Sequence, residues 1–132
     1  MSNATDNETI VRTMIDAFLR GDLDTVATAF ADDAVWDFPG HSIINGTYKG
    51  PAEIVGFLAR SFELSGGTLA VDLIDLTTSA AGACHAQWVS ADHGGRSFRS
   101  VELLHHEIQN GRIVRTWHRS DDVAITGFFG AA

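Results

Sequence analysis

The fold is decided by residues 18–40, FLRGDLDTVATAFADDAVWDFPG. In the first half, residues 22–30, apolar side chains recur every three to four positions behind an aspartate that can cap a helix. In the second half, residues 34–38, β-branched and aromatic residues favour a strand, and the Pro-Gly that follows marks a turn. The stretch therefore predicts a short helix that passes almost directly into a short strand.

Two further helices are predicted, one on each side of this stretch. Asp6 can cap a helix whose apolar residues keep helical spacing until Gly21 ends it. A second short strand is expected over residues 43–48. A third helix begins at Gly50-Pro51, with proline in its first turn.

The remainder of the chain is predicted to be β-structure. Strands are expected at about residues 68–77, 82–91, 96–108 and 112–120. Asn110-Gly111 between the last two is a strong signal for a tight hairpin, so these strands should form an antiparallel meander. No element is assigned to the closing DDVAITGFFGAA, because it is short and interrupted by glycine, although Phe128 and Phe129 must be buried somewhere, against the body or a partner.

Length and element order together predict the class of fold. The 132 residues, 45% of them apolar, suit a single domain over residues 1–132 with one core. Helices first and strands last indicate an α+β domain, with three N-terminal helices packed on a mostly antiparallel sheet. A sheet that curls to cover all three helices encloses a pocket, which is a natural site for a small molecule.

Charge and cysteine content exclude several classes of partner. Seventeen acidic against nine basic side chains give a formal charge of −8, which disfavours nucleic acid and anionic membrane surfaces. No apolar run approaches the roughly 20 residues that cross a bilayer. Cys84 is the only cysteine, and the start MSNATDNETI is unlike a secretory signal, so we expect a cytoplasmic protein.

Three strings carry a resemblance to a known family: residues 18–40 above, GTYKGPAEIVGFL at 46–58 and NGRIVRTWHRSD at 110–121. They resemble the SnoaL-like and ketosteroid isomerase-like branch of the nuclear transport factor 2-like superfamily, over about residues 8–122. The resemblance implies a cone-shaped α+β barrel around a pocket. Such pockets serve isomerases, polyketide cyclases, dehydratases, epoxide hydrolases and non-catalytic binding proteins, so the function must come from the pocket residues.

The resemblance to ketosteroid isomerases does not extend to their catalytic groups. Those enzymes use an aspartate base near the end of the first strand, with a tyrosine and a protonated aspartic acid that hold the oxyanion. Aligned on the shared strings, Met14 and Leu104 occupy the positions of the two oxyanion donors. The base position falls on Phe38, or on Asp37 if one residue is inserted. A standard ketosteroid isomerase is therefore not expected.

Two residues are the main candidates for proton transfer. His118 follows Trp117 on the last strand, and the alignment turns it toward the cavity, where a histidine can give or take a proton. A structural, hydrogen-bonded histidine is the alternative. Asp37 would be a desolvated base if it pointed inward, but strict alternation between Trp36 and Phe38 would turn it outward to water.

Two further catalytic candidates, His106 and Asp121, depend on register and local geometry. His106 and Glu102 share the strand parity of Leu104, so the alignment turns all three inward, although a slip of one residue would replace them by their neighbours. Asp121 is a possible catalytic acid or a residue that caps a turn. The residues expected to contact a substrate are Trp36, Phe38, Tyr48, Phe57, Glu102, Leu104 and Thr116. His41 is expected at the rim, and His85 and His93 are given no role.

No cofactor or metal is expected. The chain has no phosphate loop, no dinucleotide fingerprint and no paired cysteine motif, and adjacent histidines on one strand face opposite ways. We therefore predict a small cofactor-independent enzyme that acts by general acid/base proton transfer, of isomerase, cyclase or dehydratase type, on an apolar carbonyl-bearing molecule. The alternative is a non-catalytic binding protein with the same pocket. A homodimer through the outer sheet face is expected in either case.

Overall fold

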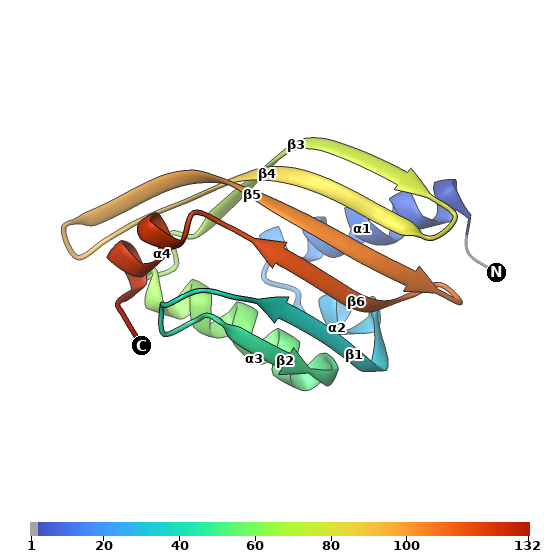
Figure 1. The fold of residues 1–132 in the computed structure, drawn as a ribbon, viewed down its shortest axis with the longest axis horizontal. Coiled ribbons are helices and arrows are strands. Elements are labelled where there is room, and N and C mark those ends of the chain that lie inside the picture. The colour runs from blue at the N-terminus through green and yellow to red at the C-terminus, as the bar shows by residue number, and fades with distance from the viewer. Residues whose placement is uncertain (1–2) are drawn as a thin grey trace.

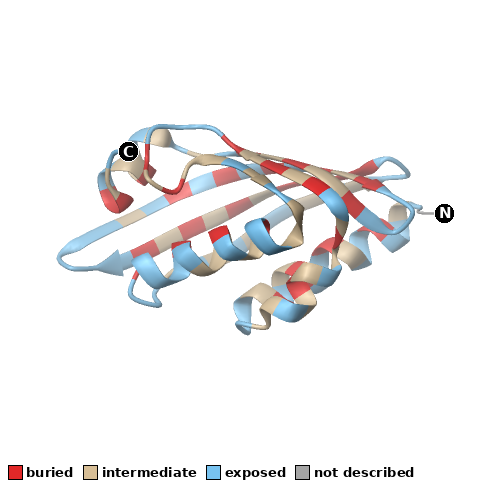
Figure 2. Cartoon of the chain, turned by 90° about the horizontal axis from the view of Figure 1, so that it is seen from below, coloured by how far each residue is buried: buried red, intermediate tan, exposed pale blue. Residues whose placement is uncertain are grey.

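The predicted order of helices and strands is present in the structure, a computed structural model that describes residues 3–132. The elements are α1 (Ala4–Leu19), α2 (Leu23–Thr28), β1 (Phe30–Phe38), β2 (Gly46–Lys49), α3 (Gly50–Leu64), β3 (Ala70–Ser79), β4 (Gly82–His93), β5 (Arg96–Gln109), β6 (Arg112–Arg119) and α4 (Asp122–Phe129). The strands form one six-stranded sheet in the order β2-β1-β6-β5-β4-β3. Helices α1, α2 and α3 cover one face of it (Figures 1 and 2). The fold is therefore α+β, as predicted.

The sheet is mixed and open. The predicted meander β3–β4–β5–β6 is antiparallel, whereas β1 pairs in parallel with β6. The pairing shifts register within β3 and within the β5–β6 pair, and such bulges bend and twist strands. Strands β2 and β3 form its two edges and do not pair with each other, so the expected barrel is a curved sheet completed by helices.

Most element boundaries follow the turn and cap signals in the sequence. Asp22 caps α2 and accepts a hydrogen bond from the Thr25 backbone N–H. Both Asn110 and Gly111 have positive φ, as a two-residue type I′ hairpin requires. The predicted cap of α1 is wrong, because Asn3 caps the helix and its side chain accepts from the N–H of Asp6.

The tail that the sequence left unassigned forms a fourth helix. Helix α4 forms over Asp122–Phe129 in spite of Gly127. Its buried residues Ile125, Phe128 and Phe129 belong to the core, and Phe98 on β5 packs against both phenylalanines. Tertiary packing thus outweighs the weak helix propensity of this segment.

Burial along β5 settles the register that the sequence left open. Ser100, Glu102, Leu104 and His106 are buried, whereas the residues between them are exposed. The partner strand β4 alternates in the same way, with Ala83, His85, Gln87 and Val89 buried. Both strands therefore turn polar as well as apolar side chains toward the helices. No helix within residues 3–132 has the length and hydropathy needed to cross a membrane.

The close approach of β4 to β5 at Gly82 gives a test of the fold. A Cβ at Gly82 would lie 2.0 Å from the His106 carbonyl oxygen, so the strands would have to separate. We expect Gly82→Ala to lower the free energy of unfolding in urea by about 1–3 kcal/mol. The control Gly56→Ala on α3, where a Cβ meets no atom within 4 Å, should raise it by up to about 1 kcal/mol. Equal effects of the two changes would contradict this packing.

Candidate functional site

A cavity lies between the helices and the inner face of the sheet. Its apolar walls include Met14, Phe18, Trp36, Phe38, Phe57, Leu104, Ile125 and Phe129. The polar side chains among its walls are Ser61, His85, Gln87, Glu102 and His118. It offers about 80 Å³ to the centres of water molecules, several times what one water needs. The cavity is therefore narrow and mostly apolar, with its polar groups gathered on the sheet.

His118 on β6 is fixed by three side chains. Its ring stacks on Phe38, with centroids 3.9 Å apart and planes 10° apart. The indole Nε1 of Trp36 donates to Nδ1 of His118 at 3.2 Å. The other nitrogen, Nε2, lies 3.0 Å from Oε2 of Glu102 on β5. Both side chains are more than nine-tenths buried, so this contact is screened little by water.

The contact with Trp36 fixes the tautomer of His118. An indole N–H can only donate, so Nδ1 must carry a lone pair and the proton lies on Nε2, toward Glu102. The Nε2–H nevertheless lacks a well-aligned hydrogen bond among the described residues, although the carboxylate is close. This N–H can therefore donate to a ligand oxygen that lies along its direction, without giving up a strong bond.

Glu102 also connects His118 to a second imidazole. Gln87 on β4 donates from Nε2 to Oε1 of Glu102 at 3.1 Å. The other amide atom of Gln87, Oε1, lies 3.0 Å from Nε2 of His85. Trp36, His118, Glu102, Gln87 and His85 thus form one chain of polar contacts across four strands, which we call the inner network.

His106 and Thr116 lie beside the inner network but do not line the cavity. The Thr116 hydroxyl lies 2.8 Å from Nδ1 of His106, and the His106 ring stacks on His85. Burial lowers the pKa of His106 well below its ordinary value, and His85 and His118 lower it further. Burial also lowers the pKa of His85. Both imidazoles are therefore neutral at physiological pH.

Asp37 points away from the cavity. Its carboxylate forms an ion pair with Arg115 on β6 and accepts a hydrogen bond from the Thr47 hydroxyl at 3.1 Å. The alternation of β1 decides this, because Trp36 and Phe38 are buried in the cavity walls on either side. The interpretation of Asp37 as an inward base is wrong.

Two other predicted site residues hold the backbone instead of facing the cavity. Asp121 caps α4 by accepting from the Ala124 N–H at 3.1 Å. The Tyr48 hydroxyl donates to the Ile44 carbonyl. The Tyr48 ring stacks on the wall residue Phe57, but Tyr48 itself does not line the cavity. Of the predicted residues, those that line the cavity are Trp36, Phe38, Phe57, Glu102, Leu104 and His118.

His85 and Gln87 are among the cavity residues that the sequence did not single out. They lie opposite Leu104 and Glu102 in the β4–β5 ladder, so they share the inner face with them. The period-two spacing of His85, Gln87 and Val89 indicates that they share one face of a strand. Whether this is the inner face depends on the strand pairing, which the sequence does not determine. No three His, Cys, Asp or Glu side chains within residues 3–132 are arranged to hold a metal ion.

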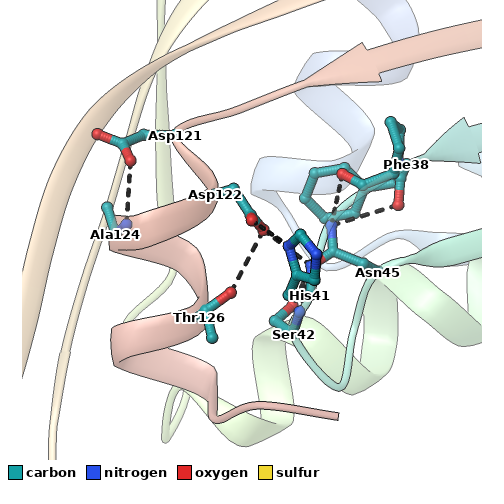
Figure 3. Close-up of polar contacts among 9 residues, drawn as sticks. Phe38, His41, Ser42, Asn45, Asp121, Asp122, Ala124 and Thr126 are labelled. Carbon is teal, nitrogen blue, oxygen red and sulfur yellow. Dashed lines mark hydrogen bonds and ion pairs between the residues drawn. The ribbon is translucent and has the colours of Figure 1, made fainter.

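Helix α4 closes one side of the cavity with Ile125 and Phe129. A latch of side chains holds it to the loop after β1 (Figure 3). Asp122 accepts from the backbone N–H of His41 at 2.8 Å and pairs with the His41 ring. Gly40 is needed here, because a Cβ would lie 2.6 Å from both Asn45 and Asp122.

The His41–Asp122 contact makes the stability of the protein depend on pH. The hydrogen bond to Asp122 raises the pKa of His41 above 6.5, and the same bond lowers the pKa of Asp122 below 3.8. The His41 contribution is therefore complete below about pH 6.5 and is lost as the pH rises through the raised folded value. The Asp122 contribution is lost as the pH falls through its own lowered value.

We therefore expect His41→Asn to lower the Tm more at about pH 5.5 than at about pH 9. Thermal unfolding followed by circular dichroism at the two pH values measures this difference. Asp122→Asn should reproduce it, and the double variant should add nothing further. A Tm difference that is the same at both pH values would contradict the latch.

Comparison with known proteins gives the family. The model of the SnoaL-like domain matches residues 11–116, so the chain belongs to the SnoaL-like domain family. An uncharacterized protein of Mycobacterium tuberculosis is 29% identical over 123 residues, which cover 92% of this chain and 94% of that protein.

Several solved structures share the fold. Bal32a, from a soil-derived mobile gene cassette, is 28% identical with a TM-score of 0.89, over 96% of this chain and 98% of that chain. A Xanthomonas campestris protein of unknown function with a cystatin-like fold is 25% identical with a TM-score of 0.86, over 98% and 99% of the two chains. IdmH of Streptomyces antibioticus, a putative polyketide cyclase, is 20% identical with a TM-score of 0.77, over 92% and 96%.

Proposed function

We propose that the protein is a small enzyme without a cofactor that moves protons by general acid/base catalysis on an apolar carbonyl compound. The reaction class is isomerisation, cyclisation or dehydration. The observation that carries the proposal is the pair formed by Glu102 and His118, 3.0 Å apart and buried in a mostly apolar cavity. Burying such a pair costs stability, so its presence in a cavity favours a functional role over a structural one.

The geometry of the pair suits the removal of a proton next to a carbonyl group. A carboxylate oxygen of Glu102 takes the proton from the carbon, and the electrons of the C–H bond pass to the carbonyl oxygen. The Nε2–H of His118 donates to that oxygen as its negative charge develops. Return of the proton to another carbon gives the isomer. Where the carbon next to the deprotonated carbon carries a hydroxyl group, that C–O bond breaks, the hydroxyl takes the proton held by Glu102 and leaves as water, and the dehydrated product remains.

The cavity walls favour an apolar substrate. Trp36, Phe38, Phe57 and Leu104 surround the polar pair and exclude water from it. The fold is shared with a putative polyketide cyclase and with TerC, a protein co-crystallized with polyporic acid. These likenesses concern the fold alone. The proposed function of this chain rests on its own cavity residues.

A non-catalytic binding protein is the second candidate. It is favoured by Met14 and Leu104, which line the cavity as apolar residues where ketosteroid isomerases place their oxyanion donors. The two candidates differ in one respect, because a binding protein needs only the shape of the cavity whereas an enzyme needs the Glu102 carboxylate.

Deuterium exchange into 2-tetralone tests the proposal. This apolar ketone has acidic C–H bonds next to its carbonyl group, and NMR in D₂O follows their exchange without any net reaction. We expect the protein to accelerate exchange over buffer. Glu102→Gln should reduce the acceleration about 100-fold or more, because an amide cannot take the proton.

The matched control is Glu107→Gln on the same strand, since Glu107 contacts Gln109 and lies outside the cavity. It should keep the full exchange rate. Exchange no faster than in buffer, while 2-tetralone still binds, would establish the binding protein instead.

We also propose that the protein forms a homodimer through the outer sheet face. This face carries Val101 and Leu103, which are 40% and 57% exposed, beside the rings of Trp88 and Trp117 in the neighbouring strands. These exposed apolar side chains favour a contact with another protein surface, with Arg99 and Arg115 lying over the two tryptophan rings. Because each copy presents the same face, a two-fold contact covers it.

We expect Leu103→Glu to convert the dimer into a monomer, because two like charges would meet near the symmetry axis. Sedimentation velocity measures the mass of each species. Val123→Glu on α4, where Val123 is 83% exposed, should leave the dimer intact. A monomeric wild-type protein at micromolar concentration would overturn the proposal.

A cytoplasmic location belongs to the same proposal. Cys84 is a free thiol on the exposed side of β4. An exposed unpaired thiol suits a reducing compartment.

A further inference from the structure

His85 is a buried imidazole in the cavity that the proposed proton transfer does not use. It is 4% exposed and forms part of the cavity wall from β4. Its Nε2 contacts Gln87, whereas its Nδ1 is buried without a hydrogen-bond partner among the described residues. A buried polar atom without a partner is costly, and in a cavity wall it is a natural contact for a ligand.

The inner network decides which nitrogen of His85 carries the proton. Glu102, when ionised, only accepts hydrogen bonds, so Gln87 must present its NH₂ group to it, as the 3.1 Å contact shows. The amide oxygen of Gln87 then faces His85, and an amide oxygen only accepts. Nε2 of His85 must therefore be the protonated nitrogen. In the neutral ring, Nδ1 is left with a lone pair.

The surroundings of His85 keep its ring neutral and in place. Burial lowers its pKa and outweighs the opposing effect of Gln87, while His118 lowers the pKa and Glu102 raises it. The ring of His106 stacks on it, with centroids 5.1 Å apart. A neutral, oriented imidazole can accept a hydrogen bond but does not repel an apolar ligand as a cation would.

The other two buried imidazoles fit this role less well. His118 has Nδ1 occupied by Trp36 and Nε2 beside Glu102, so it offers a donor and no lone pair. His106 also has a nitrogen without a partner, but it does not line the cavity. His85 is the buried histidine that combines a place in the wall with an unused lone pair.

We propose that Nδ1 of His85 accepts a hydrogen bond from the ligand, and that the cavity therefore selects apolar molecules that present a hydroxyl group. Gln87 is a positioning residue. Its NH₂ group donates to Glu102, so its amide oxygen faces His85 and fixes the tautomer of His85. The inference rests on the proposed function and deepens it by naming a group that strengthens the binding of a substrate. It holds equally for a binding protein, because recognition of a hydroxyl needs no proton transfer.

The first test is the tautomer of His85, which long-range ¹H–¹⁵N NMR spectra report directly. We expect Nε2 protonated and Nδ1 unprotonated in the free wild-type protein at about pH 7. Gln87→Met, which removes the amide oxygen at similar size, should mix the two tautomers of His85. A wild-type His85 that is protonated at Nδ1 would overturn the proposal without any ligand or variant.

The second test compares two probes of nearly equal shape, 2-naphthol and 2-methylnaphthalene. Only the first has a hydroxyl group. We expect the wild-type protein to prefer 2-naphthol by about three- to tenfold in Kd, measured by NMR titration. His85→Phe should remove the preference while 2-methylnaphthalene binds as before. His93→Phe, at the exposed tip of the β4–β5 hairpin, is the control and should keep it.

The outcomes separate this inference from the proposed function. A preference that survives in His85→Phe and is lost in His118→Phe would assign the hydroxyl to His118 and overturn the role of His85. No preference in the wild-type protein, including no binding of either probe, would also overturn it. A preference for 2-naphthol that depends on His85, without exchange into 2-tetralone, would support the role of His85 and contradict the proposed catalysis.

Discussion

Glu102 is a carboxylate inside a mostly apolar cavity, and a buried charge is stable only where donors or cations meet it. Gln87 and His118 meet its two oxygens at 3.1 and 3.0 Å, and Trp36 holds the far side of His118. These residues come from β1, β4, β5 and β6. The site therefore depends on the parallel pairing of β1 with β6, which brings Trp36 to His118 across 82 residues of sequence.

The two layers of the fold contribute different side chains to the cavity. The sheet supplies the polar groups, because neighbouring strands fix cross-strand side chains such as Gln87 and Glu102 at contact distance. The helices supply apolar walls that keep water from those groups. Helix α4 is held both by Phe98, which packs against Phe128 and Phe129, and by the exposed contact between His41 and Asp122.

Local signals in the sequence predicted local structure well. The cap at Asp22, proline in the first turn of α3 and Asn110-Gly111 each act within a few residues, and each forms as expected. Helix α4 was missed because its stability comes from Phe98, which lies far away along the chain. Asp37 was left open for a similar reason, since its direction depends on which face of β1 the helices cover.

The sequence by itself determined the α+β class, the element order and the family, and it offered His118, Glu102 and Leu104 as cavity residues with the strand register left open. Periodicity and short motifs are sufficient for these, because they reflect neighbours along the chain and a face that repeats every second residue. Only the tertiary structure decided that His85 and Gln87 complete the inner network and that Asp37 and Asp121 stay outside it. The physical reason is that hydrogen-bond partners and tautomers depend on strand pairing and burial, which one strand alone does not specify.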